Sequence, residues 1–228
     1  MKVIILGQGK LGKEISNQTK WDNLSRSTDQ IDVNEFDLWK EKLLPYDTIL
    51  NCIANTNTYS NDKMGHINTN YKFVIDLVSF CNEHNKKLIH ISTDYVYVNS
   101  NERASEDEVP VTDNSWYSHS KLLADSHIEI MSKNYLICRL SYKDKPFRYD
   151  FAWTDVKTNA DYIDVISSLV IDLIKLNTKG LYNVGTEEKT IYELAIQTNE
   201  NVKQILSPTH IPKNVTMDTS KMKNTLGL

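Results

Sequence analysis

Three residues in this sequence have the types and spacing that carbonyl reduction requires. Tyr117 and Lys121 are four positions apart, so a helix places both side chains on one face, one turn apart. A lysine ammonium near a phenol stabilises the phenolate, which makes the tyrosine a better proton donor at neutral pH. Thr93 ends a predicted strand, where its hydroxyl can donate to the same carbonyl oxygen. We therefore predict Thr93, Tyr117 and Lys121 as the catalytic residues.

A second tyrosine and lysine, Tyr59 and Lys63, have the same spacing. Tyr59 lies in a polar, asparagine-rich loop, whereas Tyr117 comes after the strand that ends at Thr93. Position in the predicted fold therefore favours Tyr117. The alternative for Thr93 alone is a structural hydroxyl that caps the end of its strand.

A glycine motif near the start of the chain predicts a dinucleotide site. It has the pattern GxGxxG, follows a predicted strand and opens a predicted helix. In this pattern the first glycine makes a tight turn, the second lets the backbone approach a pyrophosphate, and the third allows close helix–strand packing. The helix N-terminus then faces the anion. The predicted residues are Gly7, Gln8, Gly9, Lys10, Leu11 and Gly12.

The type of dinucleotide depends on the end of the second predicted strand. An acidic residue that would bind a ribose hydroxyl is not obvious there, and Ser25 and Arg26 occupy the position. A guanidinium beside hydroxyls suits a 2′-phosphate, so we predict NADPH, with NADH as the second choice. The alternative is that Arg26 is only a solvated surface charge. Further predicted cofactor contacts at the carboxyl ends of strands are Cys52, Ile53, Ala54 and Ser92, together with Tyr117 and Lys121.

The elements that must position these residues alternate along the chain. Apolar runs predict strands at 2–7, 47–54, 87–92, 135–140 and 180–185, with a short edge strand near 23–26. Between and after them, helical spacing predicts helices at 10–18, 71–81, 162–176 and 191–198, a helix capped near Asp113 and Asn114, and a short helix near Leu226. Such alternation predicts an α/β fold with a doubly wound parallel (Rossmann) sheet.

The second half of the chain is less regular. The polar stretch from about 143 to 158 is weakly periodic and is interpreted as a surface loop. We expect residues 1–142 to form the dinucleotide-binding core. Residues 143–228 are expected to add a small, shortened substrate-binding lobe and a C-terminal segment to the same domain.

Composition excludes several classes of protein. The chain has 228 residues, is 40% hydrophobic and 25% charged, and carries a net charge of −4 with both signs interspersed. This argues against a nucleic-acid or membrane partner, and the first residues do not resemble a signal peptide, so a cytoplasmic protein is expected. Cys52, Cys81 and Cys138 are expected to be reduced thiols, and the six histidines lack the spacing of a metal site, so no metal is predicted.

Several segments together resemble the extended short-chain dehydrogenases, and among them the dTDP-4-dehydrorhamnose reductases. HISTDYVYV at 90–98 is similar to that family's catalytic-strand motif, and WYSHSKLLAD at 116–125 to its catalytic helix. INTNYKFVIDL at 67–77, LYNVGTEEKTIYELA at 181–195 and the ending DTSKMKNTLGL resemble further family segments in the same order. The resemblance therefore spans most of the chain.

The resemblance implies an oxidoreductase that reduces a 4-keto-6-deoxy sugar nucleotide, the last step to an activated sugar such as rhamnose. It implies hydride transfer from the nicotinamide, a proton from Tyr117, and contact of Lys121 with the nicotinamide ribose. Substrate contacts are implied for Thr56, Thr93, Tyr95 and Tyr142. The number of chains that assemble is left open, with a homodimer as one expectation.

The chain also departs from the family pattern. The segment after 140 is shorter than in the family, Ser118 stands where the family has glycine, and the first motif is GxGxxG rather than GxxGxxG. Two other functions therefore remain as alternatives. One is a sugar-nucleotide epimerase or dehydratase on the same scaffold, and the other is a non-catalytic, cofactor-binding regulatory subunit.

Overall fold

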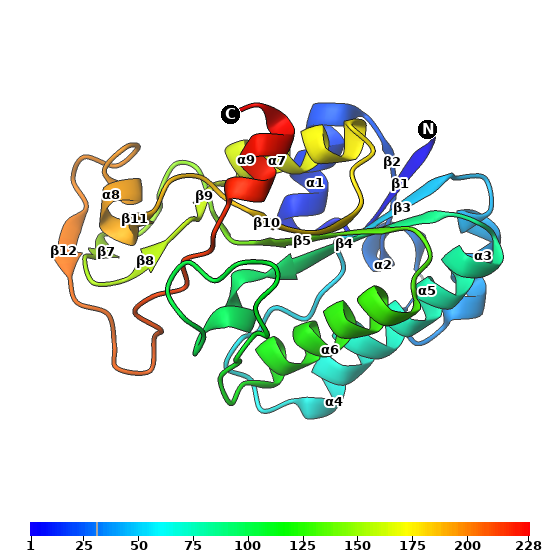
Figure 1. The fold of residues 1–228 in the computed structure, drawn as a ribbon, viewed down its shortest axis with the longest axis horizontal. Coiled ribbons are helices and arrows are strands. Elements are labelled where there is room, and N and C mark those ends of the chain that lie inside the picture. The colour runs from blue at the N-terminus through cyan, green and yellow to red at the C-terminus, as the bar shows by residue number, and fades with distance from the viewer. Residues whose placement is uncertain (31) are drawn as a thin grey trace.

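A parallel sheet forms the centre of the computed structural model, which describes residues 1–30 and 32–228 (Figure 1). Within these ranges six strands are hydrogen-bonded in the order β10-β5-β4-β3-β1-β2, and every pairing is parallel. They are β1 (Val3–Leu6), β2 (Asp22–Leu24), β3 (Thr48–Asn51), β4 (Lys87–Thr93), β5 (Tyr135–Leu140) and β10 (Gly180–Val184). The predicted doubly wound sheet is confirmed.

The strand order indicates where on the sheet a ligand would bind. From β1 the chain goes outward to the edge strand β2 and then returns to β3 on the other side of β1. The connections that leave β1 and β3 therefore run to opposite sides, and parallel sheets bind ligands where this reversal occurs. The glycine motif follows β1 and Cys52 follows β3, so both lie at this point.

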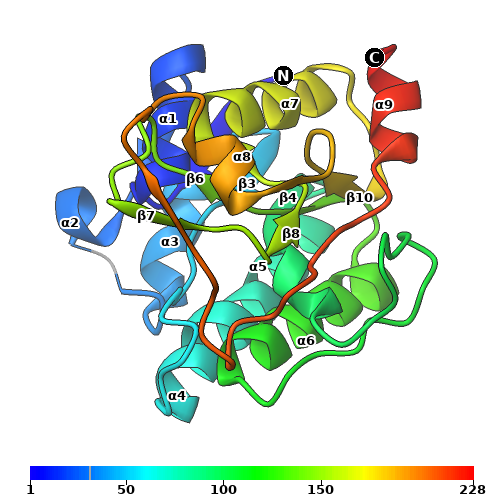
Figure 2. The same ribbon diagram turned by 90° about the vertical axis from the view of Figure 1, so that its left-hand side faces the viewer.

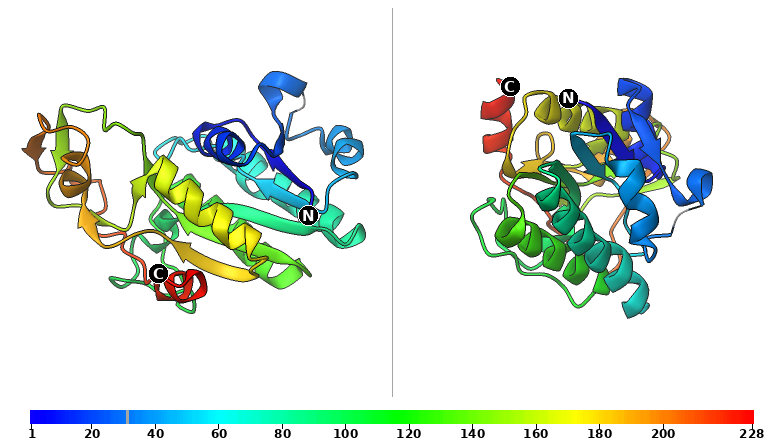
Figure 3. Two further views of the ribbon diagram at one scale, coloured as in Figure 1. Left: turned by 90° about the horizontal axis from the view of Figure 1, so that it is seen from above. Right: turned by 90° about the vertical axis from the view of Figure 1, so that its right-hand side faces the viewer.

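Helices cover both faces of the sheet (Figure 3). One face carries α1 (Lys10–Thr19), α7 (Ile163–Lys175) and α9 (Ser220–Leu226). The other carries α3 (Phe36–Leu43), α5 (Phe73–Glu83) and α6 (Trp116–Met131). Shorter elements are α2 (Arg26–Asp29), α4 (Lys63–His66), α8 (Ile191–Ala195), the π-helix η1 (Ile67–Lys72) and the 3₁₀-helix η2 (Asp94–Tyr97).

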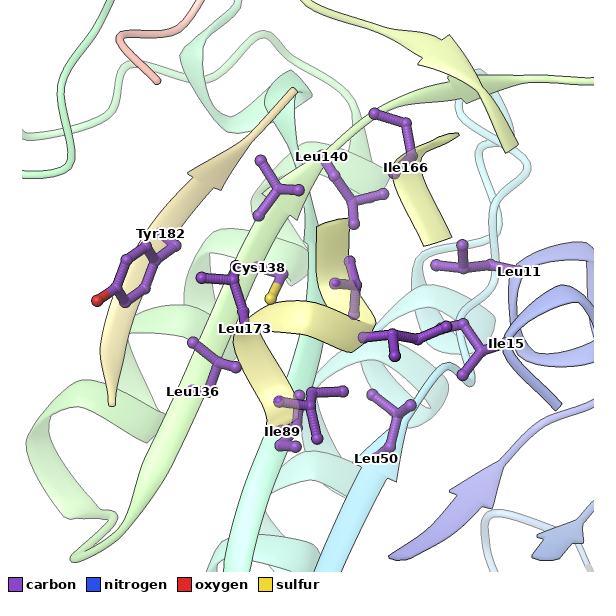
Figure 4. Close-up of a cluster of buried hydrophobic side chains, with 14 of the residues drawn as sticks. Leu11, Ile15, Leu50, Ile89, Leu136, Cys138, Leu140, Ile166, Leu173 and Tyr182 are labelled. Carbon is purple, nitrogen blue, oxygen red and sulfur yellow. The ribbon is translucent and has the colours of Figure 1, made fainter. Parts of the chain in front are cut away.

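Neighbouring residues of each strand pack on opposite faces, which explains the continuous apolar runs. Ile5 belongs to the cluster under α1 and α7, whereas Ile4 and Leu6 belong to the cluster under α3 and α5. Figure 4 shows part of the first cluster, in which helix residues such as Leu11 and Leu173 pack among residues of the strands. A strand that is buried on both faces therefore has a nearly continuous run of apolar side chains.

Helix α3 was not predicted from the sequence. Its buried residues are Trp39 and Leu43, and the Trp39 ring contacts Phe73 of α5 at 5.4 Å between centroids. The helix is only eight residues long, so two buried side chains give too weak a periodic signal to identify it. The capping expectation for α6 was also off by one or two residues, because Ser115 is the N-cap.

A small lobe extends from the sheet at the end where α8 and β7 lie (Figure 2). Its core contains Phe147, Ala152 and Val156, all buried, so the prediction of a surface loop at 143–158 is wrong. The stretch forms strands of two or three residues that pair with distant partners, which local periodicity does not detect. The strands of the lobe are β6 (Tyr142–Lys143), β7 (Phe151–Trp153), β8 (Lys157–Thr158), β9 (Asp161–Tyr162), β11 (Lys189–Thr190) and β12 (Lys203–Ile205).

The lobe is not one continuous C-terminal segment. Its apolar core joins residues 147–162 to residues 191–211. Between them the chain returns to the main sheet, where α7 packs on α1 and β10 pairs with β5. Within residues 143–228, α7, β10 and α9 contribute apolar residues to the main core, and the division at 142 stays a prediction. No helix in the described ranges is long and apolar enough to cross a membrane.

Candidate active site

The first turn of α6 holds Tyr117 in place. The side chain of the N-cap, Ser115, accepts a hydrogen bond from the Ser118 backbone at 3.2 Å. Asp113 in turn accepts hydrogen bonds from the backbone and hydroxyl of Ser115 at 3.0 and 2.7 Å, and one from the Ser118 hydroxyl at 2.5 Å. A capped first turn leaves little freedom to the backbone that carries Tyr117.

The structure brings the hydroxyls of Thr93 and Tyr117 together. Thr93 ends β4, and its side chain lies beside the Tyr117 phenol, where it lowers the pKa of the phenol. Burial acts in the opposite direction and dominates, so the pKa of Tyr117 is raised to about 12. Tyr117 is therefore fully protonated at neutral pH, as a proton donor must be. A carbonyl oxygen placed between the two hydroxyls could accept a hydrogen bond from both.

The amine of Lys121 faces the sheet rather than the phenol. It donates to the backbone carbonyl of Ile91 at 2.6 Å and lies 2.9 Å from Nε2 of His90. The side chain is 1% exposed, and burial lowers its pKa to about 8. The expected lowering of the Tyr117 pKa by this ammonium is therefore corrected: burial dominates that pKa, and the group that lowers it is Thr93. His90 was missed because nothing in the spacing of β4 and α6 predicts its contact with Lys121.

The alternative pair, Tyr59 and Lys63, does not lie on one helix face. Tyr59 is in the loop before α4, and Lys63 is the first residue of that helix, with its amine 4.7 Å from the centre of the Trp116 ring. The Tyr59 hydroxyl nevertheless lies 3.3 Å from that of Tyr95. The Tyr95 ring contacts Tyr117 edge to face, with 6.2 Å between centroids. Tyr59 therefore lies at the rim of the site, which sequence reasoning missed.

A buried carboxyl group lies directly beside Thr93. The Thr93 hydroxyl donates to Asp94 at 3.2 Å, and Asp94 is 2% exposed. Burial raises the pKa of Asp94 to about 7, although Lys143 of the lobe lowers it. Asp94 and Lys143 line a small cavity together with Tyr95 and Trp153. The lobe thus completes the surroundings of Thr93, which could not be expected from a stretch interpreted as a loop.

A cavity of about 560 Å³ opens beside the glycine motif. Its walls combine the turn after β1, the start of α2 and the segment after β3. Eight of the predicted cofactor residues line it: Gly7, Gln8, Gly9, Ser25, Arg26, Cys52, Ile53 and Ala54. Ser27, whose hydroxyl was expected next to Arg26, also lines it, and sequence reasoning missed the remaining lining residues, which are Asp32, Val33, Trp39, Asn55 and Thr69.

Each glycine of the motif meets a different geometric requirement. Gly7 has a φ of +95°, a conformation that side chains disfavour. A Cβ on Gly12 would lie 2.1 Å from the Gly7 carbonyl oxygen, so this glycine allows α1 to pack against β1. A Cβ on Gly9 would meet no protein atom within 4 Å. Gly9, the N-cap of α1, thus leaves open space at a helix N-terminus, which fits the approach of a pyrophosphate.

Arg26 and Asp32 give the cavity one cationic and one anionic group. The Arg26 guanidinium lies 3.7 Å from the Asp32 carboxylate, and both residues line the cavity. The Arg26 side chain is 82% exposed, which leaves it free to turn toward a bound anion. A hydrogen bond from Asn34 holds the pKa of Asp32 below its usual value, with a smaller contribution from Arg26. Asp32 is an acidic residue that sequence reasoning did not identify for this cavity.

The remaining predicted residues lie away from the wall of this cavity. Lys10 lines a smaller cavity with Tyr142. The Ser92 hydroxyl donates to Asp125 at 2.9 Å, and Leu11 packs in the core. Thr56 is exposed in the loop after β3. Thr56, Ser92 and Tyr142 therefore remain predicted contacts.

Comparison with solved structures shows the same fold in several enzymes. A hypothetical dTDP-4-dehydrorhamnose reductase from Sulfolobus tokodaii has a TM-score of 0.84 at 21% identity, over 98% of this chain and 94% of that one. The Bacillus anthracis dTDP-4-dehydrorhamnose reductase, solved with NADP, has a TM-score of 0.81 at 19% identity, over 98% and 93%. Bordetella bronchiseptica WbmG, solved with NAD and UDP, has a TM-score of 0.81 at 15% identity, over 100% of this chain and 89% of that one.

The search of curated proteins finds no match. The family model described as RmlD substrate binding domain matches residues 1–167, which include the glycine motif, Thr93, Tyr117 and Lys121. With that match, the chain belongs to the RmlD substrate binding domain family.

Proposed function

We propose that this protein reduces the 4-keto group of a 6-deoxy sugar nucleotide, with NADPH as hydride donor. The observation that carries the proposal is the position of the Thr93 side chain beside the buried Tyr117 phenol at the carboxyl end of β4. Family membership supports the reaction class, because the solved structures with a similar fold include dTDP-4-dehydrorhamnose reductases. The sugar-nucleotide part is supported by WbmG, whose structure holds NAD and UDP.

The cavity beside the glycine motif fits a dinucleotide. Gly7 and Gly9 leave the backbone open at the N-terminus of α1, and Ser25 and Arg26 line the same cavity. Cys52, Ile53 and Ala54 would lie along the cofactor on the β3 side. When bound, the nicotinamide supplies the hydride for the carbonyl carbon.

The residues of this chain supply orientation and the proton. Thr93 and Tyr117 bind the carbonyl oxygen, which gains negative charge as reduction proceeds. Tyr117 then transfers its phenolic proton to that oxygen, which completes the alcohol. Tyr95, whose ring contacts Tyr117, would pack against the substrate, and burial raises its pKa so that its own hydroxyl stays protonated.

Consumption of NADPH tests the proposal directly. The purified protein is mixed with NADPH and a 4-keto-6-deoxy nucleotide sugar, and the absorbance of the reduced cofactor is followed. We expect stoichiometric oxidation, and none with the matched nucleotide sugar that carries a 4-hydroxyl. A changed sugar without net cofactor oxidation would instead indicate an epimerase or dehydratase. No change in either compound would indicate a non-catalytic subunit, and both outcomes would contradict the proposal.

The preference for NADPH rests on Arg26. Replacing Arg26 with Ala should raise the KM for NADPH about tenfold, because one charge-assisted contact to the 2′-phosphate is lost. The KM for NADH should stay unchanged. Initial rates with both cofactors measure this. Arg103→Ala is the matched control, since Arg103 is also exposed and paired with a carboxylate, that of Glu188. Equal KM values for NADPH in wild type and Arg26→Ala would rule out the assignment.

A further inference from the structure

His90 and Asn51 form a buried polar contact in the centre of the sheet. They are paired residues of the neighbouring strands β4 and β3, and both are fully buried. Nδ2 of Asn51 lies 3.2 Å from Nδ1 of His90. Lys121 approaches the other ring nitrogen, Nε2, at 2.9 Å. The imidazole therefore lies between the Lys121 amine and the Asn51 side-chain amide.

The hydrogen bonds of Asn51 determine which ring nitrogen carries the hydrogen. The backbone N–H of Ile53 donates to Oδ1 of Asn51 at 3.1 Å, which identifies that atom as the oxygen. The amide nitrogen of Asn51 therefore faces His90 and donates to Nδ1, which must hold a lone pair. Burial, with a smaller contribution from Lys121, lowers the pKa of His90 well below its usual value, so the ring is neutral and its hydrogen is on Nε2.

This arrangement constrains the charge of Lys121. The N–H at Nε2 points at the lysine nitrogen, and an ammonium has no lone pair with which to accept it. A neutral amine can accept that hydrogen and still donate to the Ile91 carbonyl at 2.6 Å. A charged Lys121 requires the ring hydrogen to move to Nδ1, and the Asn51 amide must then turn. The ring tautomer and the charge of Lys121 are thus linked.

We propose that His90 is a positioning residue, which fixes the Lys121 amine and governs, through its ring tautomer, whether that amine carries a proton. The catalytic role of His90 rests on the proposed function, because His90 would affect the reaction only through Lys121. Below the Lys121 pKa of about 8 the amine carries its proton and the ring hydrogen is on Nδ1, whereas above it the amine is neutral and the hydrogen is on Nε2.

Other ionisable groups face the same amine and must act alongside His90. Tyr117 and Asp125 lie one turn before and one turn after Lys121 on α6, and Cys52 approaches from the end of β3. The Asp125 carboxylate already accepts hydrogen bonds from Arg139 and Ser92, each at 2.9 Å. Burial raises the pKa of Cys52 to about 12, so it stays a neutral thiol. His90 is the group in direct contact with the amine.

Two NMR titrations of the intact protein, without substrate, test the proposal. In the first, ¹³C-labelled lysine reports the protonation of Lys121, whose signal is assigned by its loss in Lys121→Arg. In the second, ¹⁵N-labelled histidine reports the tautomer of His90. We expect the ring hydrogen to move from Nε2 to Nδ1 as Lys121 gains its proton. A tautomer that stays constant through the lysine titration would overturn the proposal.

A substitution adds a second, independent readout. His90→Gln keeps an oxygen that can accept from an ammonium but removes the ring hydrogen, so the pKa of Lys121 should rise by about one pH unit, a tenfold change in proton affinity. His84→Gln, on another element, should leave it unchanged. If NADPH is consumed as proposed, the basic limb of the kcat profile should move to higher pH by the same amount, with little change in KM.

The results separate this proposal from the proposed function. Identical Lys121 titrations in wild type and His90→Gln would contradict the role of His90 even if the keto sugar is reduced. The expected titrations without any NADPH consumption would keep the link between His90 and Lys121 and refute only the reductase. A merely structural histidine would lower the Tm without changing the lysine titration.

Discussion

Replacing Tyr117 with Phe should lower kcat by about 10²- to 10⁴-fold, the usual contribution of a general acid. Only one oxygen is removed, so the ring keeps its edge-to-face contact with Tyr95 and its place on the capped turn of α6. Binding of NADPH should change little, because Tyr117 does not line the cavity that holds the glycine motif. Steady-state kinetics measure kcat, and fluorescence titration with NADPH measures the affinity for the cofactor.

Tyr59→Phe is the matched control for this prediction. Tyr59 has the same spacing to a lysine, and its hydroxyl touches Tyr95 rather than Thr93. It is 51% exposed, so loss of its hydroxyl should reduce kcat less than about threefold. Equal losses in the two variants would show that the wrong pair was assigned. A lower affinity for NADPH in Tyr117→Phe would show that the phenol acts in binding rather than in proton transfer.

Replacing Asp125 with Ala should lower the free energy of unfolding by about 3–5 kcal/mol, because it leaves a buried guanidinium without its partner. The Asp125 and Arg139 side chains are 0% and 2% exposed, and they lie 2.9 Å apart between α6 and β5. Ser92 of β4 donates to the same carboxylate oxygen. The pair therefore ties the helix that carries Tyr117 and Lys121 to two strands of the sheet.

Urea denaturation followed by circular dichroism measures this loss. Glu188→Ala is the control, because it removes the partner of the exposed Arg103 and should cost less than about 1 kcal/mol. A loss of about 1 kcal/mol or less in Asp125→Ala would mean that water or a rearranged Tyr97 compensates for Arg139. Tyr97 already contacts that guanidinium through its hydroxyl, so the double variant with Tyr97→Phe would detect such compensation.

The main architecture could be predicted from the sequence because it depends on strong local signals. The run at 3–6 is apolar at every position and the run at 135–140 at every position except Arg139, as expected of strands buried on both faces. Gly7 and Gly12 have backbone requirements that no other residue meets, so their spacing identified the dinucleotide turn. Tyr117 and Lys121 share a helix face by spacing alone.

The sequence could not predict contacts between distant segments. The lobe depends on strands of two or three residues whose partners lie some fifty positions away, as β7 pairs with β12, and so short a strand carries no periodic signal. Asp32 reaches the cavity beside Arg26 only because the chain turns after α2. Tertiary structure also decided the protonation and contacts of Lys121. Burial against β4 sets the pKa of Lys121 and its contact with His90, and both depend on the packing of α6 on the sheet. Residue types and spacing thus determined the groups available for catalysis, whereas packing determined their neighbours and their charge.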